Sequence, residues 1–139
     1  MKIITLFWFI DMTRIIVTRI EWLLRIGVFL TFLGHGFFAL YGKAQWIKYL
    51  TIFGFSDSTA LKLMTYIGVI DILIALVVLL RPHKYIVFYA FIWAFSTALI
   101  RPISGESILD FVERGANWVT PLCLFLLLNS KRKIESKVF

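Results

Sequence analysis

The sequence predicts an all-α integral membrane protein: an antiparallel four-helix transmembrane bundle with an N-terminal amphipathic lead-in helix. Of its 139 residues, 60% are hydrophobic, and the mean hydropathy is +0.88, whereas about half of a soluble domain is apolar. The apolar residues fall into four blocks, and a helix needs about 20 such residues to cross a bilayer. Basic residues cluster at the ends of the blocks, as they do in membrane proteins. We expect one domain, residues 1–139.

The segment before the first block carries a polar stripe. Its members are three and four residues apart, which places them on one face of a helix: Asp11, Arg14, Thr18, Glu21 and Arg25. Apolar residues occupy the remaining faces. Such a helix either lies in the membrane interface or runs straight into the first span.

The first span is predicted at residues 22–42. Its glycines, Gly27, Gly34 and Gly36, allow close contact with a neighbouring helix. The segment that follows contains Trp46 together with tyrosine, phenylalanine and lysine. Because such side chains settle at the level of the lipid headgroups, we expect a short interfacial helix there.

The second and third spans are predicted at residues 59–80 and 85–100, and each is followed by Arg-Pro. Proline biases the preceding residue away from the helical conformation, so each span should end there. The connection between the two spans is long enough only for a tight antiparallel hairpin. The fourth span is predicted at residues 111–129, with a start near Ile108 or Phe111, and residues 130–139 form a basic tail.

Four spans place both termini on one side of the membrane. That side holds ten of the fifteen Lys and Arg residues, namely Lys2, Arg14, Arg19, Arg25, Arg81, Lys84, Lys131, Arg132, Lys133 and Lys137. Because cytoplasmic loops carry the excess of basic residues, both termini are predicted to be cytoplasmic. We expect the bacterial cytoplasmic (inner) membrane.

Asp71 lies near the middle of the second span. A charge at the bilayer centre costs about 2.5–3.5 kcal/mol on insertion scales, so it needs a partner or a function. The first span offers Arg25 and His35 at flanking depths, and Asp71 should face the bundle interior near one of them. An ion pair, a proton or ligand site, and a protonated, merely tolerated aspartate remain open.

A second polar group is predicted at the opposite membrane face from the termini. Its candidates come from the ends of the first, third and fourth spans and from the loop after the third: Lys43, Arg101, Glu106, Glu113, Arg114 and Asn117. Glu113 and Asn117 are four residues apart and share a helix face. The cluster either locks the helix ends together or lines a pocket for a polar head group.

No catalytic constellation, nucleic-acid motif or metal site is expected from the sequence. His35 has no second histidine at its depth because His83 lies on the hairpin, so a haem with two histidine ligands is not expected. Cys123 is the lone cysteine. We therefore predict no cofactor and no metal.

Three stretches of the chain resemble the DoxX-like family of small four-helix membrane proteins: RIGVFLTFLGHGFFALYGK from Arg25, IGVIDILIALVVLLRP around Asp71, and RPISGE…FVERGANWVTPLCLFLL from Arg101. The resemblance covers about residues 22–130. This chain has Asp71 where many relatives carry glutamate. Members of that family are linked to sulfur and quinone redox complexes, to oxidative-stress assemblies and to receptor-assembly chaperones.

Two functions follow as expectations. The first is a non-catalytic membrane component, which is a subunit, a chaperone or a lipophile-binding bundle with a polar pocket. The alternative is a small quinone-handling oxidoreductase subunit that uses Asp71 and His35 as proton carriers. The expected partners are the lipid bilayer and either another membrane protein or a lipophilic small molecule; a homo-oligomer remains open.

Overall fold

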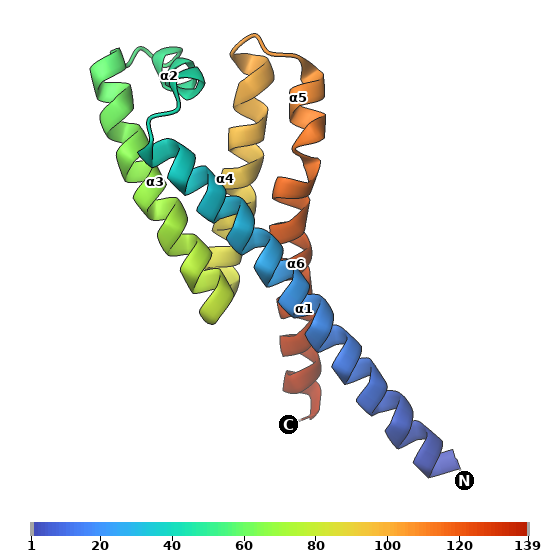
Figure 1. Ribbon diagram of the computed structural model, residues 1–139. Helices are drawn as coiled ribbons and strands as arrows, with labels where there is room; N and C mark the ends of the chain where they lie inside the picture. Colours follow the sequence, from blue (N-terminus) through green and yellow to red (C-terminus); the bar gives the residue numbers. More distant parts are fainter. Residues whose placement is uncertain (1, 139) are drawn as a thin grey trace.

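The computed structural model describes the backbone of residues 2–138 and the side chains of residues 12–131. Every element in that part of the chain is helical: α1 (Lys2–Leu40), α2 (Ala44–Thr51), α3 (Asp57–Leu80), α4 (Lys84–Ile103), α5 (Ile108–Glu113) and α6 (Gly115–Val138) (Figure 1). Four segments are long and apolar enough to cross a membrane: Met12–Leu40, Asp57–Leu80, Lys84–Ile103 and Ile108–Lys131. The predicted all-α membrane fold with four spans is confirmed.

The lead-in segment and the first span form one uninterrupted helix, α1. Of the two arrangements that the polar stripe allowed, the structure has the continuous one. Glu21 and Arg25 lie on the part of α1 that packs in the bundle, whereas Arg14 and Thr18 are exposed. The side chain of Asp11 lies outside the described residues.

Local signals explain where most of the helices begin and end. The Ser56 hydroxyl accepts a hydrogen bond from the Thr59 amide at the start of α3, and Ser107 accepts one from the Leu109 amide at the start of α5. The third span was predicted to end at residue 100, but α4 continues to Ile103 with Pro102 in its last turn. Because proline has no amide hydrogen, α4 lacks the bond that residue 102 would donate to the carbonyl oxygen of Ala98, and the helix ends one residue later.

The fourth predicted span consists of two helices. The span begins at Ile108, which was one of the two predicted starts. The helix that begins there breaks at Arg114, whose φ and ψ are −88° and 10°. The amide of Asn117 then bonds to the carbonyl oxygen of Arg114, which starts α6. At its far end α6 remains helical to Val138, so the backbone of the predicted tail continues the helix.

The helices pack as two pairs, α1 on α3 and α4 on α6, while α1 also crosses α6. The first pair is close because two glycines face each other. A Cβ atom on Gly36 would lie 2.8 Å from the carbonyl oxygen of Gly68, and a Cβ atom on Gly68 would lie 2.7 Å from that of Gly36. Gly27 faces Thr120 of α6, whereas Gly34 faces open space.

The two pairs meet at one end of the bundle and separate toward the other. Figure 1 shows α3 and α4 converging at their hairpin and diverging toward α2. The packed core lies in the convergent part and includes Val28, Phe32, Ala75, Val78, Val87 and Leu124. Large apolar side chains on the outside are exposed, Leu80 by 74% and Leu109 by 69%, which suits a surface in contact with lipid.

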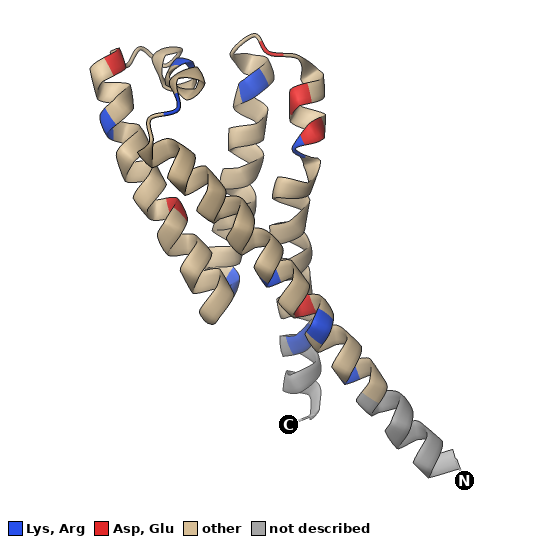
Figure 2. Ribbon diagram, in the orientation of Figure 1, with Lys and Arg blue, Asp and Glu red and all other residues tan. Residues whose placement is uncertain are grey.

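Both ends of the described chain lie at the convergent end, together with the hairpin between α3 and α4 (Figure 1). We call this the terminal end. The other end, called the loop end, is formed by α2, α5 and the loop between α4 and α5. Figure 2 shows blue basic positions along the terminal end and a group of acidic positions on α5 at the loop end.

Candidate functional site

A cavity of about 360 Å³ occupies the loop-end half of the bundle, where the two helix pairs separate. Side chains of α1, α3, α4 and α6 form its sides, and α2 covers it. The wall is predominantly apolar, with Phe32, Trp46, Phe53, Met64, Trp93 and Ala94 among its residues. Polar groups border it at a few points: His35, Tyr49, Asp71, Thr97, Arg101, Arg114 and Asn117.

Asp71 faces this cavity from α3, as the sequence predicted for an interior position. The residue is only 4% exposed, and its Oδ1 atom has no hydrogen-bond partner among the described residues. Trp93 of α4 lies near the carboxyl group and also lines the cavity. A buried carboxyl group with an unused oxygen is costly, which makes Asp71 the residue of the cavity wall that most needs an explanation.

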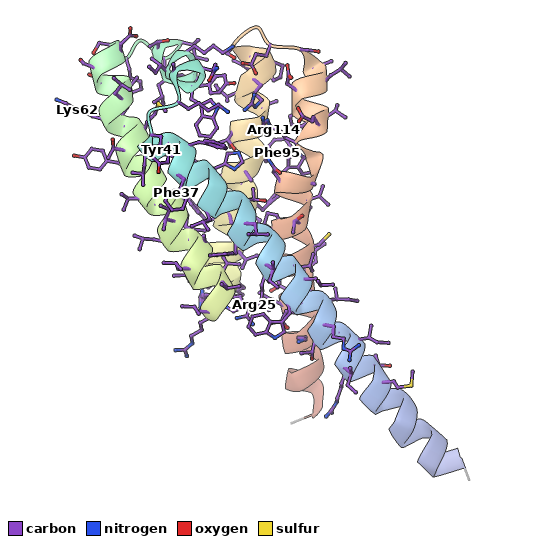
Figure 3. The ribbon with its side chains drawn as sticks, viewed as in Figure 1. Arg25, Phe37, Tyr41, Lys62, Phe95 and Arg114 are labelled. Atoms are coloured by element: carbon purple, nitrogen blue, oxygen red, sulfur yellow. The ribbon has the colours of Figure 1, made fainter. Side chains whose placement is uncertain are left out.

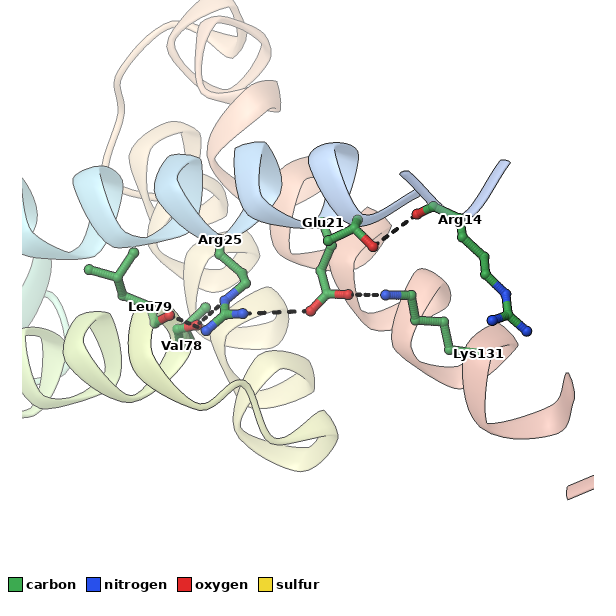
Figure 4. A network of polar contacts seen from close by, with 7 residues as sticks. Arg14, Glu21, Arg25, Val78, Leu79 and Lys131 are labelled. Carbon is green, nitrogen blue, oxygen red and sulfur yellow. Dashed lines mark hydrogen bonds and ion pairs between the residues drawn. The ribbon is translucent and has the colours of Figure 1, made fainter. Parts of the chain in front are cut away.

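The predicted pairing of Asp71 with Arg25 is wrong. Arg25 lies at the terminal end, where its Nε donates to the carbonyl oxygen of Val78 at 3.3 Å and its Nη2 donates to that of Leu79 (Figure 4). These carbonyls belong to the last turn of α3, which has no intrahelical donors for them. The positive guanidinium also complements the negative end of the helix dipole. The helix end, rather than the mid-span acid, therefore holds Arg25.

Glu21 extends this contact to α6. Its carboxylate lies 3.7 Å from Arg25 on one side and binds the ammonium group of Lys131 on the other (Figure 4). The guanidinium of Arg25 also lies over the ring of Trp22, 4.0 Å from its centre. This network joins α1, α3 and α6 at the terminal end, away from the cavity.

His35 borders the cavity from α1 but forms no ion pair with Asp71 within 4.0 Å. Its Nδ1 donates to the carbonyl oxygen of Thr31 at 2.7 Å, because a carbonyl can only accept. Its ring stacks on Trp46 of α2 with 5.5 Å between the ring centres. His35 and Asp71 thus line the same cavity without forming an ion pair.

Glu106 is the centre of the polar cluster at the loop end. Its carboxylate lies 3.1 Å from Arg101 and 2.5 Å from Lys48, and it accepts a hydrogen bond from the Tyr49 hydroxyl at 2.7 Å. These contacts tie α2 to the end of α4. Arg101 and Glu106 were predicted members of this cluster. Lys48 and Tyr49 were not, because their pattern indicated only an interfacial helix.

The protonation of this cluster follows from its contacts. The hydrogen bond from Lys48 holds the pKa of Glu106 below its usual 4.5, against an opposing effect of burial, and the Tyr49 hydroxyl adds to the lowering. Burial raises the pKa of Tyr49 to about 12, and its bond to Glu106 acts in the same direction. At neutral pH the carboxylate is charged and the phenol is neutral, so each suits its role as acceptor and donor.

Two predicted members of the cluster lie outside it. Glu113 is exposed, and within the described residues it makes no ion pair, because the break at Arg114 separates its helix from the face that carries Asn117. Lys43 lies over the rings of Phe38 and Trp46, 4.6 Å and 5.2 Å from their centres. The prediction of one connected group of six residues was therefore wrong.

Arg114 and Asn117 are brought to the cavity by the start of α6. Both line it and an adjoining hollow of about 220 Å³ that His35 and Lys43 share. Figure 3 shows Arg114 at the side of α5 and α6 that faces the other helices, whereas Lys62 extends away from α3. The Nε atoms of Arg101 and Arg114 are buried without a hydrogen-bond partner among the described residues.

The arrangement suits binding better than bond making. It combines an apolar wall with a carboxyl group at depth and two guanidinium groups near the loop end. The described residues contain no group of three or more His, Cys, Asp or Glu side chains that could hold a metal ion.

Cys123, the lone cysteine, is exposed on α6 and does not line the cavity. Comparisons of the chain with protein-family models, with curated proteins and with solved structures find no match.

Proposed function

We propose that this protein is a non-catalytic membrane component that binds a lipophilic small molecule with a polar group inside its bundle. One observation carries the proposal: Asp71, Arg101 and Arg114 line one apolar cavity of about 360 Å³, and each has a buried polar atom without a hydrogen-bond partner among the described residues. Ligand sites are typically mostly apolar hollows of about 300–1,000 Å³ with a few polar groups that fix orientation.

The energetic argument is that native proteins rarely bury unused polar atoms. Each such atom costs about 1–3 kcal/mol, more where the group is charged. Three of them around one cavity are difficult to explain by stability alone, since apolar residues would fill the same space at lower cost.

Co-purification tests the proposal. The protein is purified in mild detergent, and its lipophilic extract is compared with that of Ala98→Leu, which fills the cavity from α4. Ala116→Leu, on an exposed position of α6, is the matched control. A compound that is enriched with the wild type and the control and lost from Ala98→Leu supports the proposal. Identical extracts from all three proteins contradict it.

The second candidate function is a quinone-handling subunit. The observation that favours it is that His35 and Asp71, the expected proton carriers, border the same cavity. Its test is the absorption spectrum of the same extract. A quinone that is lost from Ala98→Leu would favour this candidate, and a compound without redox chemistry would count against it.

The remaining expectations are proposals at this stage. They are the cytoplasmic position of both termini, the bacterial inner membrane, the DoxX-like resemblance and a role beside another membrane protein or a second copy of the chain. The excess of basic residues at the terminal end supports the first of them.

A further inference from the structure

We propose that the cavity takes a lipophilic hydroxy acid, whose anionic group binds at Arg101 and Arg114 and whose hydroxyl group, at the other end of the molecule, binds Asp71. This inference rests on the proposed binding function and adds the chemical class of the ligand. It follows from the charge at the loop end of the cavity, the carboxyl residue Asp71 in its deeper wall, and the size of the space between them.

The charge at the loop end is positive and incompletely balanced. Glu106 is shared between Arg101 and Lys48. Arg114 has no ion-pair partner among the described side chains. Arg101 and Arg114 both line the cavity, and Lys43 lines the adjoining hollow, so three cations lie near this end of the bundle. A carboxylate or similar anion bound beside the two guanidinium groups that line the cavity would balance this charge, and charge-assisted hydrogen bonds to guanidinium groups are strong.

At its deeper side the cavity presents Asp71. The Oδ1 atom of this residue accepts no hydrogen bond from a described residue, and neither Arg25 nor His35 neutralises the carboxyl group. A hydroxyl group both donates and accepts. It therefore satisfies Asp71 whether the carboxyl group is ionised or protonated, and a purely apolar end does not.

The dimensions limit the ligand to one chain or one small ring system. Trp93, the neighbour of Asp71, and Arg101 are eight residues apart on α4, which corresponds to about 12 Å of helix. A dry cavity of about 150 Å³ holds benzene, so 360 Å³ holds roughly 14 non-hydrogen atoms. A phospholipid with two acyl chains is too large.

The experiment compares three probes of equal chain length in nanodiscs that contain the full chain: ω-hydroxydecanoate, decanoate and α,ω-decanediol. Binding is measured by calorimetry against empty nanodiscs, because all three probes also enter the bilayer. We expect ω-hydroxydecanoate to bind about fivefold more tightly than decanoate, as one neutral hydrogen bond implies. The diol should bind at least about tenfold more weakly than ω-hydroxydecanoate because it lacks the charge.

Variants assign each preference to its residue. In Asp71→Leu the advantage of ω-hydroxydecanoate over decanoate should disappear while decanoate binds as before, and Asp71→Asn should restore part of it. In Arg114→Gln the advantage of ω-hydroxydecanoate over the diol should fall. Arg114→Lys, which keeps the charge, should retain most of that advantage, and it shows that the fold tolerates a change at this position.

Two failures remain distinguishable. Equal affinity for the three probes in the wild type, with binding lost in Ala98→Leu, would overturn the ligand class and leave the binding function standing. Absence of binding for all three probes, together with lipophilic extracts that do not differ between the wild type and Ala98→Leu, would overturn both.

Discussion

At the scale of single residues, Glu106 is the contact that keeps the cavity covered. It receives Arg101 from α4 and both Lys48 and Tyr49 from α2, while α2 otherwise packs mainly on α3. Trp46 and Phe53, which form part of the cavity wall, are carried by α2 and the turn that follows it. One carboxylate thus links the cover of the cavity to the opposite helix pair.

Glu106→Gln should loosen α2. The variant keeps the size of the side chain but loses the charge that holds Lys48 and Arg101, and we expect a loss of about 1 kcal/mol in unfolding free energy. Maleimide labelling of Leu50→Cys, which lines the cavity from α2, should become faster in a Cys123→Ala background. Glu113→Gln, at an exposed acid of the same end, is the matched control. Equal labelling rates in both variants would show that Glu106 does not hold α2.

The same contact should depend on pH. The pKa of Glu106 is lowered in the folded state, so its contribution to stability is present above the unfolded value of 4.5 and is lost as the pH falls through the folded pKa. The labelling rate of Leu50→Cys should therefore rise only in acid below that value. Glu106→Gln should abolish this rise, and a rise of the same size in Glu106→Gln would contradict the assignment.

Arg25 is a second single residue with a structural role, because it stabilises the terminal end. Arg25→Leu leaves the carbonyl oxygens of Val78 and Leu79 without their donor, and we expect a loss of about 2 kcal/mol in detergent thermal unfolding. Arg14→Leu, on the exposed part of α1, should change little. Similar melting temperatures for the two variants would mean that Arg25 contributes no more than a surface charge.

At the scale of elements, the contact between α1 and α3 depends on two glycines. Gly68→Ala places a methyl group 2.7 Å from the carbonyl oxygen of Gly36. The two helices must move apart, which costs about 1–3 kcal/mol. Gly34→Ala, with nothing within 4 Å, should be neutral or stabilising because alanine favours helix by about 1 kcal/mol over glycine. Thermal unfolding of the two variants in one detergent compares them, and equal destabilisation would refute the close crossing.

The elements also show how far sequence reasoning reaches. Hydropathy and length are local properties, so the four spans and the hairpin at Pro82 could be predicted. The break at Arg114 could not be predicted, because the spacing of Glu113 and Asn117 fits one face of a single continuous helix. The partner of Arg25 was predicted from its depth in the membrane, but the free carbonyls at the end of α3 are visible only once the helices are packed.

The candidate site, like the helices, could be predicted from the sequence only in part. Asp71 stands out in any apolar span, and its interior position follows from the cost of exposing it to lipid. Lys48 and Tyr49 do not stand out, because an aromatic and basic interfacial helix explains them equally well. The cavity itself arises from the divergence of two helix pairs, and no residue pattern in the sequence encodes that separation.

At the scale of the whole molecule, both chain ends lie at the terminal end, and the cavity lies in the half of the bundle toward the loop end. We expect the terminal end to be cytoplasmic. In a Cys123→Ala background, Ser107→Cys should react with an impermeant thiol reagent that is added outside cells, whereas Ser130→Cys should react only after the membrane is permeabilised. Labelling of Ser130→Cys in intact cells would reverse the orientation.

The central claim is that the separation of the two helix pairs creates a ligand site and is not simply space filled by bulk lipid. A fatty acid that carries a photoactivatable diazirine tests this most directly, with peptide mass spectrometry to locate the crosslinks in nanodiscs. We expect crosslinks to Phe32, Met64 and Trp93, which line the cavity, and their loss when unlabelled ω-hydroxydecanoate is added in excess. Crosslinks confined to outward positions such as Leu80 and Leu109, unchanged by the competitor, would contradict it.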